Sequence, residues 1–187
     1  MERETIIDLP NYLRVLNFFI QNDIMKVRLL ITGGTIDKVY NQSNGELEFD
    51  KTHFTEMISR ARVEVDMSIE QLLLIDSLDM VDKDRDLILD RCIHCDEEFV
   101  LITHGTDTMC DTAKLLGENS INKAIVLFGA MVPYAVSNSD ALFNFGCALG
   151  SLQLLKPGVY VSMNGRVLPW SGVEKNRSLG IFQAIDS

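Results

Sequence analysis

The chain has 187 residues, 47% of them hydrophobic, so one domain can bury its core without a metal ion or a disulfide. With 17 Lys and Arg residues against 27 Asp and Glu residues, its net charge is −10, which disfavours nucleic acid and anionic membrane surfaces as partners. No stretch approaches the roughly eighteen uninterrupted apolar residues of a membrane-spanning helix, so no membrane span is expected.

Residues 1–24 are predicted to form a helical extension that precedes the main domain at residues 25–187. Leu13, Leu16 and Phe19 would share one side of this amphipathic helix. The start of the chain lacks the basic residues of a secretory signal, and its four cysteines are scattered as in a reducing compartment. A cytoplasmic location is therefore expected.

Apolar runs of strand length alternate with helical patterns through the rest of the chain. The runs predict strands at 27–31, 71–75, 99–103, 124–128 and 159–163. The helical patterns predict helices at 52–61, 82–95, 108–116 and 140–155. Uninterrupted apolar strands are typical of a parallel sheet that is covered on both faces. The alternation therefore predicts an α/β fold: a three-layer α/β/α sandwich around a mostly parallel, Rossmann-like sheet.

Residues 37–50 form the longest stretch without a clear period, and they follow Thr35 directly. The turn-forming residues Asn41, Asn44 and Gly45 lie within this stretch. A loop beside a reactive residue predicts a lid. A hairpin tip or a solvent loop without a function explains the same composition.

Two of the predicted strands end in similar turns, Thr32-Gly33-Gly34-Thr35 and Thr103-His104-Gly105-Thr106-Asp107. In an open parallel sheet, ligands bind at the carboxyl ends of the strands. If the two strands are neighbours, Thr35, Thr106 and Asp107 would surround one small pocket. This arrangement predicts a site for nucleophilic chemistry.

A threonine hydroxyl becomes an effective nucleophile only when a neighbouring base takes its proton. His104 is one candidate for this base, but we favour a role for it in orienting the loop through hydrogen bonds. A lysine held by Asp107 could serve instead, and the spacing alone does not identify that lysine. Thr106 or Asp107 could also cap the following helix without any chemical role.

The segment Cys92-Ile93-His94-Cys95 has the spacing of a zinc half-site or a redox pair. No second pair completes a four-ligand site. We therefore interpret these cysteines as unrelated thiols near the end of a helix, and no metal site is predicted.

Five segments, taken in order, carry a specific combination of motifs. They are Thr32-Gly33-Gly34-Thr35-Ile36, Asp76-Ser77-Leu78-Asp79-Met80, His104-Gly105-Thr106-Asp107-Thr108-Met109, Phe128-Gly129-Ala130-Met131-Val132-Pro133 and Tyr160–Leu168. This combination resembles that of the bacterial-type L-asparaginases. The resemblance runs from about Met25 to about Gln183 and implies the fold of the family's N-terminal domain.

The resemblance implies that Thr35 attacks the side-chain amide of L-asparagine, or of a related small amide, to form an acyl-enzyme. Thr106, Asp107 and Lys175 would handle the proton, and ammonia would leave. Ser77 would bind the α-carboxylate of the substrate, and Asp107, beside Thr106, its α-amino group. No cofactor is implied.

The chain also departs from the family pattern. The family's second, C-terminal domain has no counterpart before Ser187. The position of the family's lid tyrosine falls on Leu47, and Tyr40 lies nearby in the sequence. Leu78 stands where many members carry a polar residue.

Two alternatives stay open beside a small asparaginase. They are a non-catalytic module that binds an amino acid, and an amidase or esterase for a larger substrate. The resemblance also implies self-association, as a homodimer or homotetramer.

Overall fold

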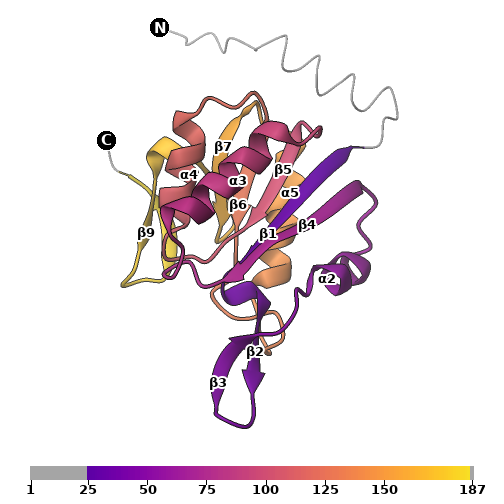
Figure 1. Ribbon diagram of the computed structural model, residues 1–187, viewed down its shortest axis with the longest axis vertical. Helices are drawn as coiled ribbons and strands as arrows, with labels where there is room; N and C mark the ends of the chain where they lie inside the picture. The colour runs from indigo at the N-terminus through magenta and orange to yellow at the C-terminus, as the bar shows by residue number, and fades with distance from the viewer. Residues whose placement is uncertain (1–24, 186–187) are drawn as a thin grey trace, which may run out of the picture.

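The computed structural model describes residues 25–185, and the helix predicted within residues 1–24 lies outside them. The described chain is built on a six-stranded sheet with the order β4-β1-β5-β6-β7-β8 (Figure 1). The strands are β1 (Lys26–Gly33), β4 (Asp66–Ile75), β5 (Phe99–Thr103), β6 (Ala124–Phe128), β7 (Gly158–Met163) and β8 (Arg166–Pro169). The pairs from β4 to β7 are parallel, and β8 pairs with β7 in the antiparallel direction. The predicted mostly parallel sheet is thus confirmed.

Helices cover both faces of this sheet and complete the predicted three-layer sandwich. The helices α3 (Asp82–His94) and α4 (Met109–Glu118) pack on one face, and α2 (Phe54–Ala61) and α5 (Ala141–Leu152) on the other (Figure 1). Strand β1 shows the division, because Leu29 belongs to the core cluster of Phe145 in α5, whereas Leu30 belongs to that of Ile88 in α3. All five residues of β6 are buried, which explains why its apolar sequence does not alternate.

Two short hairpins and two 3-10 turns lie outside the sheet. The strands β2 (Lys38–Asn41) and β3 (Glu46–Phe49) form a hairpin that projects from the body of the molecule (Figure 1). The strands β9 (Val173–Asn176) and β10 (Ile181–Ala184) form a second hairpin beside α4. The turn η1 (Thr35–Asp37) precedes β2, and η2 (Trp170–Gly172) precedes β9.

The structure differs from the sequence prediction at the margins of the fold. Residues 37–50 contain the β2–β3 hairpin, and β4 begins at Asp66 rather than at residue 71. The apolar patterns of the sequence do not predict β8, β9 or β10. Each of these strands has four residues, which is too short for an apolar period to show. None of the helices within residues 25–185 has the length and hydropathy needed to cross a membrane.

Candidate active site

Three neighbouring strands carry predicted site residues just beyond their carboxyl ends. Strand β1 lies between β4 and β5 in the sheet. The chain leaves β1 toward Thr35, β5 toward Thr106 and β4 toward Ser77. The two glycine turns therefore follow adjacent parallel strands, and Ser77 joins them from a third strand. This edge of the sheet is where ligands bind in open α/β folds.

Close backbone packing holds the three turns together. A Cβ atom on Gly34 would lie 2.4 Å from the amide nitrogen of Gly105, and one on Gly105 would lie 2.5 Å from Oγ of Ser77. Gly34 also has a φ of 83°, which L side chains rarely adopt. Its N–H donates to the carbonyl of Ile75 at 2.9 Å, which ties the first turn to the end of β4. Glycine at these positions is therefore a requirement for bringing the turns into contact.

Lys175 of β9 reaches the second turn from a distant part of the chain. Its Nζ lies 2.8 Å from Oγ1 of Thr106 and 2.9 Å from Oδ1 of Asp107. The side chain of Lys175 is 11% exposed, and Thr106 is 6% exposed. The contact between Lys175 and Thr106 is thus largely shielded from water, which strengthens it, whereas the side chain of Asp107 is 33% exposed. The structure brings Thr106, Asp107 and Lys175 together, with Thr35 on the adjoining turn.

The capping alternative for Thr106 and Asp107 is wrong, because α4 begins at Met109 with Thr108 as its N-cap residue. The Thr108 hydroxyl donates to the carbonyl of Ser77 at 2.8 Å. The guanidinium group of Arg85 in turn donates to Oγ1 of Thr108 at 3.2 Å. These bonds fasten the Ser77 turn to the start of α4.

A second cation, Arg177, lies beside Asp107. Its guanidinium group is 3.5 Å from Oδ1 of Asp107 and 3.3 Å from the carbonyl oxygen of the same residue. The Arg177 side chain is 68% exposed, so the contact contributes little to stability. Sequence reasoning missed Arg177, because no motif signals a contact between residues seventy positions apart.

Asp76 and Ser77, which follow β4, differ in their contacts. Oδ2 of Asp76 accepts a hydrogen bond from Nζ of Lys38 at 2.6 Å. Burial raises the pKa of Asp76, but the hydrogen bond and charge of Lys38, with the N–H of Leu78 and the charge of Lys175, outweigh it and hold this pKa below its usual value. Ser77 is 1% exposed, and its Oγ has no hydrogen-bond partner among the described residues. The Ser77 hydroxyl therefore keeps an unused donor within the buried turn.

His104 lies behind the second turn and holds its shape. Nδ1 is 2.8 Å from the carbonyl oxygen of Gly105, and Nε2 is 2.7 Å from Oγ1 of Thr112. Because a carbonyl only accepts, Nδ1 carries the proton and Nε2 accepts from the Thr112 hydroxyl. Burial lowers the pKa of His104 to about 4, so the ring is neutral at pH 7. Both ring nitrogens are occupied within the fold, which supports the orienting role over that of a base.

Asp37, at the end of η1, links the Thr35 turn to the start of α2. Its Oδ1 accepts from the hydroxyl of Thr52 and from the backbone N–H of His53, both at 3.0 Å. Burial raises the pKa of Asp37 even though both hydrogen bonds act to lower it. These bonds fix the path of the chain directly after Thr35.

The β2–β3 hairpin leaves this same turn. Tyr40 and Leu47 are directly opposite each other in its register, and they are 60% and 45% exposed. Leu47 occupies the position of the family's lid tyrosine, and Tyr40 is the tyrosine near it. The two side chains thus share one exposed face of the hairpin. That this hairpin acts as a lid stays a prediction.

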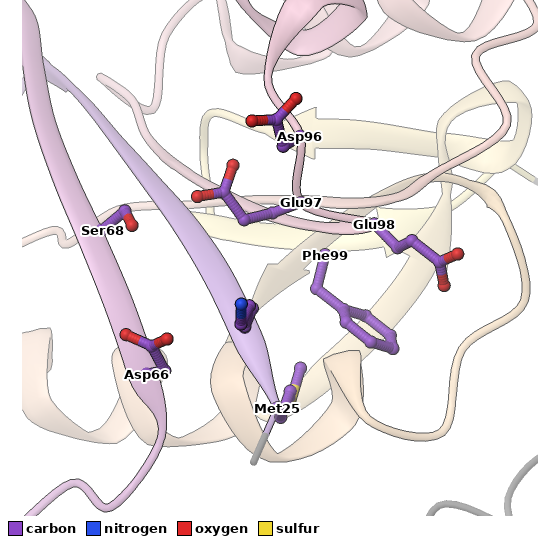
Figure 2. Close-up of a pocket in the computed structure, with 8 residues that line it drawn as sticks. Met25, Asp66, Ser68, Asp96, Glu97, Glu98 and Phe99 are labelled. Atoms are coloured by element: carbon purple, nitrogen blue, oxygen red, sulfur yellow. The ribbon is translucent and has the colours of Figure 1, made fainter. Parts of the chain in front are cut away.

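A separate pocket of about 460 Å³ lies at the opposite edge of the sheet, at the amino ends of β1 and β4. Figure 2 shows the carboxylates of Asp66, Asp96, Glu97 and Glu98 around it. It contains none of the predicted site residues. Within residues 25–185, no group of His, Cys, Asp and Glu side chains is arranged to hold a metal ion. The four cysteines are free thiols.

Comparisons with known proteins agree with this architecture. Residues 26–187 match the family described as "Asparaginase, N-terminal". An L-asparaginase from Thermococcus kodakarensis is 30% identical over 169 residues, which cover 87% of this chain and 52% of that protein. The structure of the thermostable L-asparaginase from the same organism matches with a TM-score of 0.77 and 29% identity, over 87% of this chain and 52% of that one.

Two further relatives lie at similar distances. A probable periplasmic L-asparaginase from Haemophilus influenzae is 31% identical over 173 residues, covering 85% of this chain and 48% of that protein. The structure of a probable cytoplasmic L-asparaginase from Campylobacter jejuni matches with a TM-score of 0.75 and 29% identity, over 87% of this chain and 53% of that one. The chain spans about half the length of the curated relatives that it matches.

The α/β sandwich described above is thus the fold of the L-asparaginase structures. The chain belongs to the asparaginase family and matches the N-terminal part of its members.

Proposed function

We propose that this chain is an asparaginase-like amidohydrolase that hydrolyses the side-chain amide of L-asparagine, or of a related small amide, through a threonine acyl-enzyme. The observation that carries the proposal is the position of Lys175, whose Nζ lies within 2.9 Å of both Thr106 Oγ1 and Asp107 Oδ1. This cluster adjoins the turn of Thr35. Acyl transfer by a threonine requires a proton acceptor within reach of its hydroxyl, and a lysine held in this way is a candidate acceptor for Thr35.

In the proposed reaction, Oγ1 of Thr35 attacks the amide carbon, and its proton passes to the cluster of Lys175, Thr106 and Asp107. The C–N bond breaks, and the departing nitrogen takes a proton from the cluster to leave as ammonia. Water then hydrolyses the Thr35 ester and releases the acid. Backbone N–H groups of the glycine turns are candidates for stabilising the oxyanion, at about 3–4 kcal/mol for each donor.

The same geometry suggests how a substrate is oriented. The buried hydroxyl of Ser77 has no partner among the described residues, and it would donate to the α-carboxylate. Thr106 and Asp107 line the opposite turn, where Asp107 is the acceptor for an α-amino group. Because Ser77 packs against Gly105, the hydroxyl of Ser77 and the carboxylate of Asp107 are held at a fixed spacing.

We also propose that the protein is cytoplasmic and self-associates as a homodimer or homotetramer. Its free cysteines suit a reducing compartment. Phe143 and Leu179 are more than 60% exposed, and a contact between subunits that buried them would be favourable. Light scattering at micromolar concentration tests this, and a monomer alone would contradict it.

Ammonia release from L-asparagine by the purified chain tests the proposed activity. Thermal unfolding with and without aspartate is measured beside it. Turnover supports the hydrolase. A melting temperature raised by aspartate, with no ammonia from any amide, favours the non-catalytic binding module instead. A panel of larger amides and esters identifies an enzyme with a different substrate.

A further inference from the structure

The pair of Cys92 and Cys95, which the proposed function does not use, lies at the edge of the sheet opposite the candidate active site. Cys92 is in the last turn of α3, and Cys95 follows the end of this helix as its C-cap residue, shortly before β5. Lys123 directly precedes β6. Cys95 and Lys123 thus stand at the amino ends of neighbouring strands, whereas Thr35 and Thr106 follow the carboxyl ends of theirs.

The two thiols differ in their surroundings. Cys92 is fully buried in the core cluster of Ile88, and this burial raises the pKa of its thiol. Cys95 is only partly buried and packs at the margin of the same cluster. A thiol held in an apolar core stays protonated and inert, whereas an oxidant can reach a partly exposed one. Cys95 is therefore the residue of this pair that is open to chemistry.

Lys123 contacts the sulfur of Cys95 directly. Its Nζ lies 3.1 Å from Sγ of Cys95 and also donates to the carbonyl oxygen of the same residue. The backbone of Lys123 is fixed as well, because its N–H donates to the carbonyl of Ile121 and its carbonyl accepts from the N–H of Gly158, each at 2.8 Å. The fold therefore holds an amine nitrogen beside this sulfur.

A cation beside a partly exposed sulfur is the setting in which reactive cysteines occur. Glu97, two residues after Cys95, is paired with Arg28 at 3.0 Å, so its carboxylate is engaged by a different cation. Cys147 of α5 is also partly buried, but no lysine donates to its sulfur within residues 25–185. The contact with Lys123 thus distinguishes Cys95 from a thiol of similar exposure.

We propose that Cys95 is a site of reversible oxidation by hydrogen peroxide, and that Lys123 captures the oxidised sulfur in a covalent S–N bond. In the first step, the O–O bond of the peroxide breaks, an S–O bond forms at Cys95, and the second oxygen leaves as water. The sulfur loses two electrons to the peroxide and becomes a sulfenic acid.

The second step needs no further oxidant. The ammonium group of Lys123 gives one proton to water, and the lone pair of the resulting amine forms a bond with the sulfur of Cys95. The S–O bond breaks, and its oxygen leaves as water with a second proton from the amine. Sulfenic acids condense with backbone nitrogen in the same manner. The S–N bond joins the end of α3 to the start of β6, across 28 positions of the chain.

The test treats the reduced full chain with hydrogen peroxide and analyses its tryptic peptides by mass spectrometry. We expect a product in which the peptide of Cys95 is joined to that of Lys123 with the loss of two hydrogens, and we expect dithiothreitol to separate them. Cys95→Ser should abolish this product. Lys123→Arg keeps the positive charge but offers no amine, so it should leave a sulfenic acid at Cys95 that dimedone labels. Cys147 in the same variant should be labelled about tenfold more slowly.

Cys92→Ala separates capture by Lys123 from disulfide formation, and the link from Cys95 to Lys123 should persist in this variant. A disulfide of Cys92 with Cys95, which stays within one tryptic peptide, would overturn the inference. A wild-type Cys95 that stops at the sulfenic acid, or that reacts no faster than Cys147, overturns it as well. Circular dichroism checks that each reduced variant is folded. The outcome is independent of the proposed function, because the readout is a covalent product and not ammonia.

Discussion

Gly34 and Gly105 stand in backbone contact, since a Cβ atom on Gly34 would lie 2.4 Å from the Gly105 amide nitrogen. The two residues lie in the turns that follow the adjacent strands β1 and β5, and they directly precede Thr35 and Thr106. This contact brings the two turns that carry these threonines together. The site therefore depends on backbone packing as much as on its reactive side chains.

Replacing Gly34 by alanine should lower the free energy of unfolding by about 3 kcal/mol, from overpacking and from a strained positive φ. Activity should fall with it, because the Thr35 turn must move away from Gly105. Urea unfolding and ammonia release measure the two effects. Gly150→Ala is the control, since nothing lies within 4 Å of its added Cβ, and in α5 it should stabilise by about 0.5–1 kcal/mol. Equal effects of both substitutions would contradict the packing argument.

His104 should make the stability depend on pH between pH 4 and 6.5. Its pKa is about 4 in the fold because of burial, whereas the unfolded imidazole titrates near 6.5. The unfolded chain therefore binds a proton first as the pH falls. The contribution of His104 to the free energy of unfolding is fully present above pH 6.5, and the free energy of unfolding declines by about 3 kcal/mol as the pH falls to 4.

The measurement is the free energy of unfolding at pH 7 and at pH 4 for wild type and His104→Gln. Carboxylates contribute to both proteins alike, so the difference between the two slopes isolates the imidazole. Parallel profiles would show that His104 is not a buried neutral ring.

Ser77→Ala should separate binding from stability. The hydroxyl is buried without a hydrogen-bond partner among the described residues, so its removal costs the fold little. A lost hydrogen bond to a charged carboxylate should raise KM by about tenfold to a hundredfold. Ser162→Ala is the control, because its hydroxyl is also buried and unpartnered in that same part of the chain, within β7. A KM that responds equally to both changes would remove Ser77 from the site.

Lys175→Met should reduce kcat by about a hundredfold or more, the usual contribution of a proton-transfer group. The fold should persist, because the carboxylate of Asp107 is 33% exposed and stays hydrated without the lysine, and methionine fills much of the same volume. Circular dichroism checks the fold, and Lys114→Met controls for loss of a lysine elsewhere. An active Lys175→Met protein would exclude this lysine from proton handling.

The sequence predicts the centre of this fold better than its margins. Strands β5 and β6 match their predicted bounds, because burial on both faces imposes an uninterrupted apolar run. The first half of β4 has a pattern that would have predicted a strand, because Met67 and Ile69 alternate with polar residues as in an edge strand. Strand β9 has no such pattern, because only one of its four residues is apolar. Its pairing with β10 is what makes this segment a strand.

The same distinction applies to the candidate site. The turns of Thr35 and Thr106 are visible because an apolar run ends at glycine in each. Lys175 comes from the resemblance alone, since its role depends on a hairpin that folds back from another part of the chain. The pairing of Lys38 with Asp76 joins residues 38 positions apart, and local patterns contain no information about such contacts.

Thr35 is proposed to be the nucleophile of an amide hydrolase, and the decisive measurement is ammonia release from a small ω-amide by wild type, Thr35→Ala and Thr55→Ala. Thr55 is an exposed threonine in α2 and controls for the substitution itself. We expect at least a thousandfold loss of turnover in Thr35→Ala, about 4 kcal/mol in the barrier, and no loss in Thr55→Ala. Equal turnover by wild type and Thr35→Ala would contradict it.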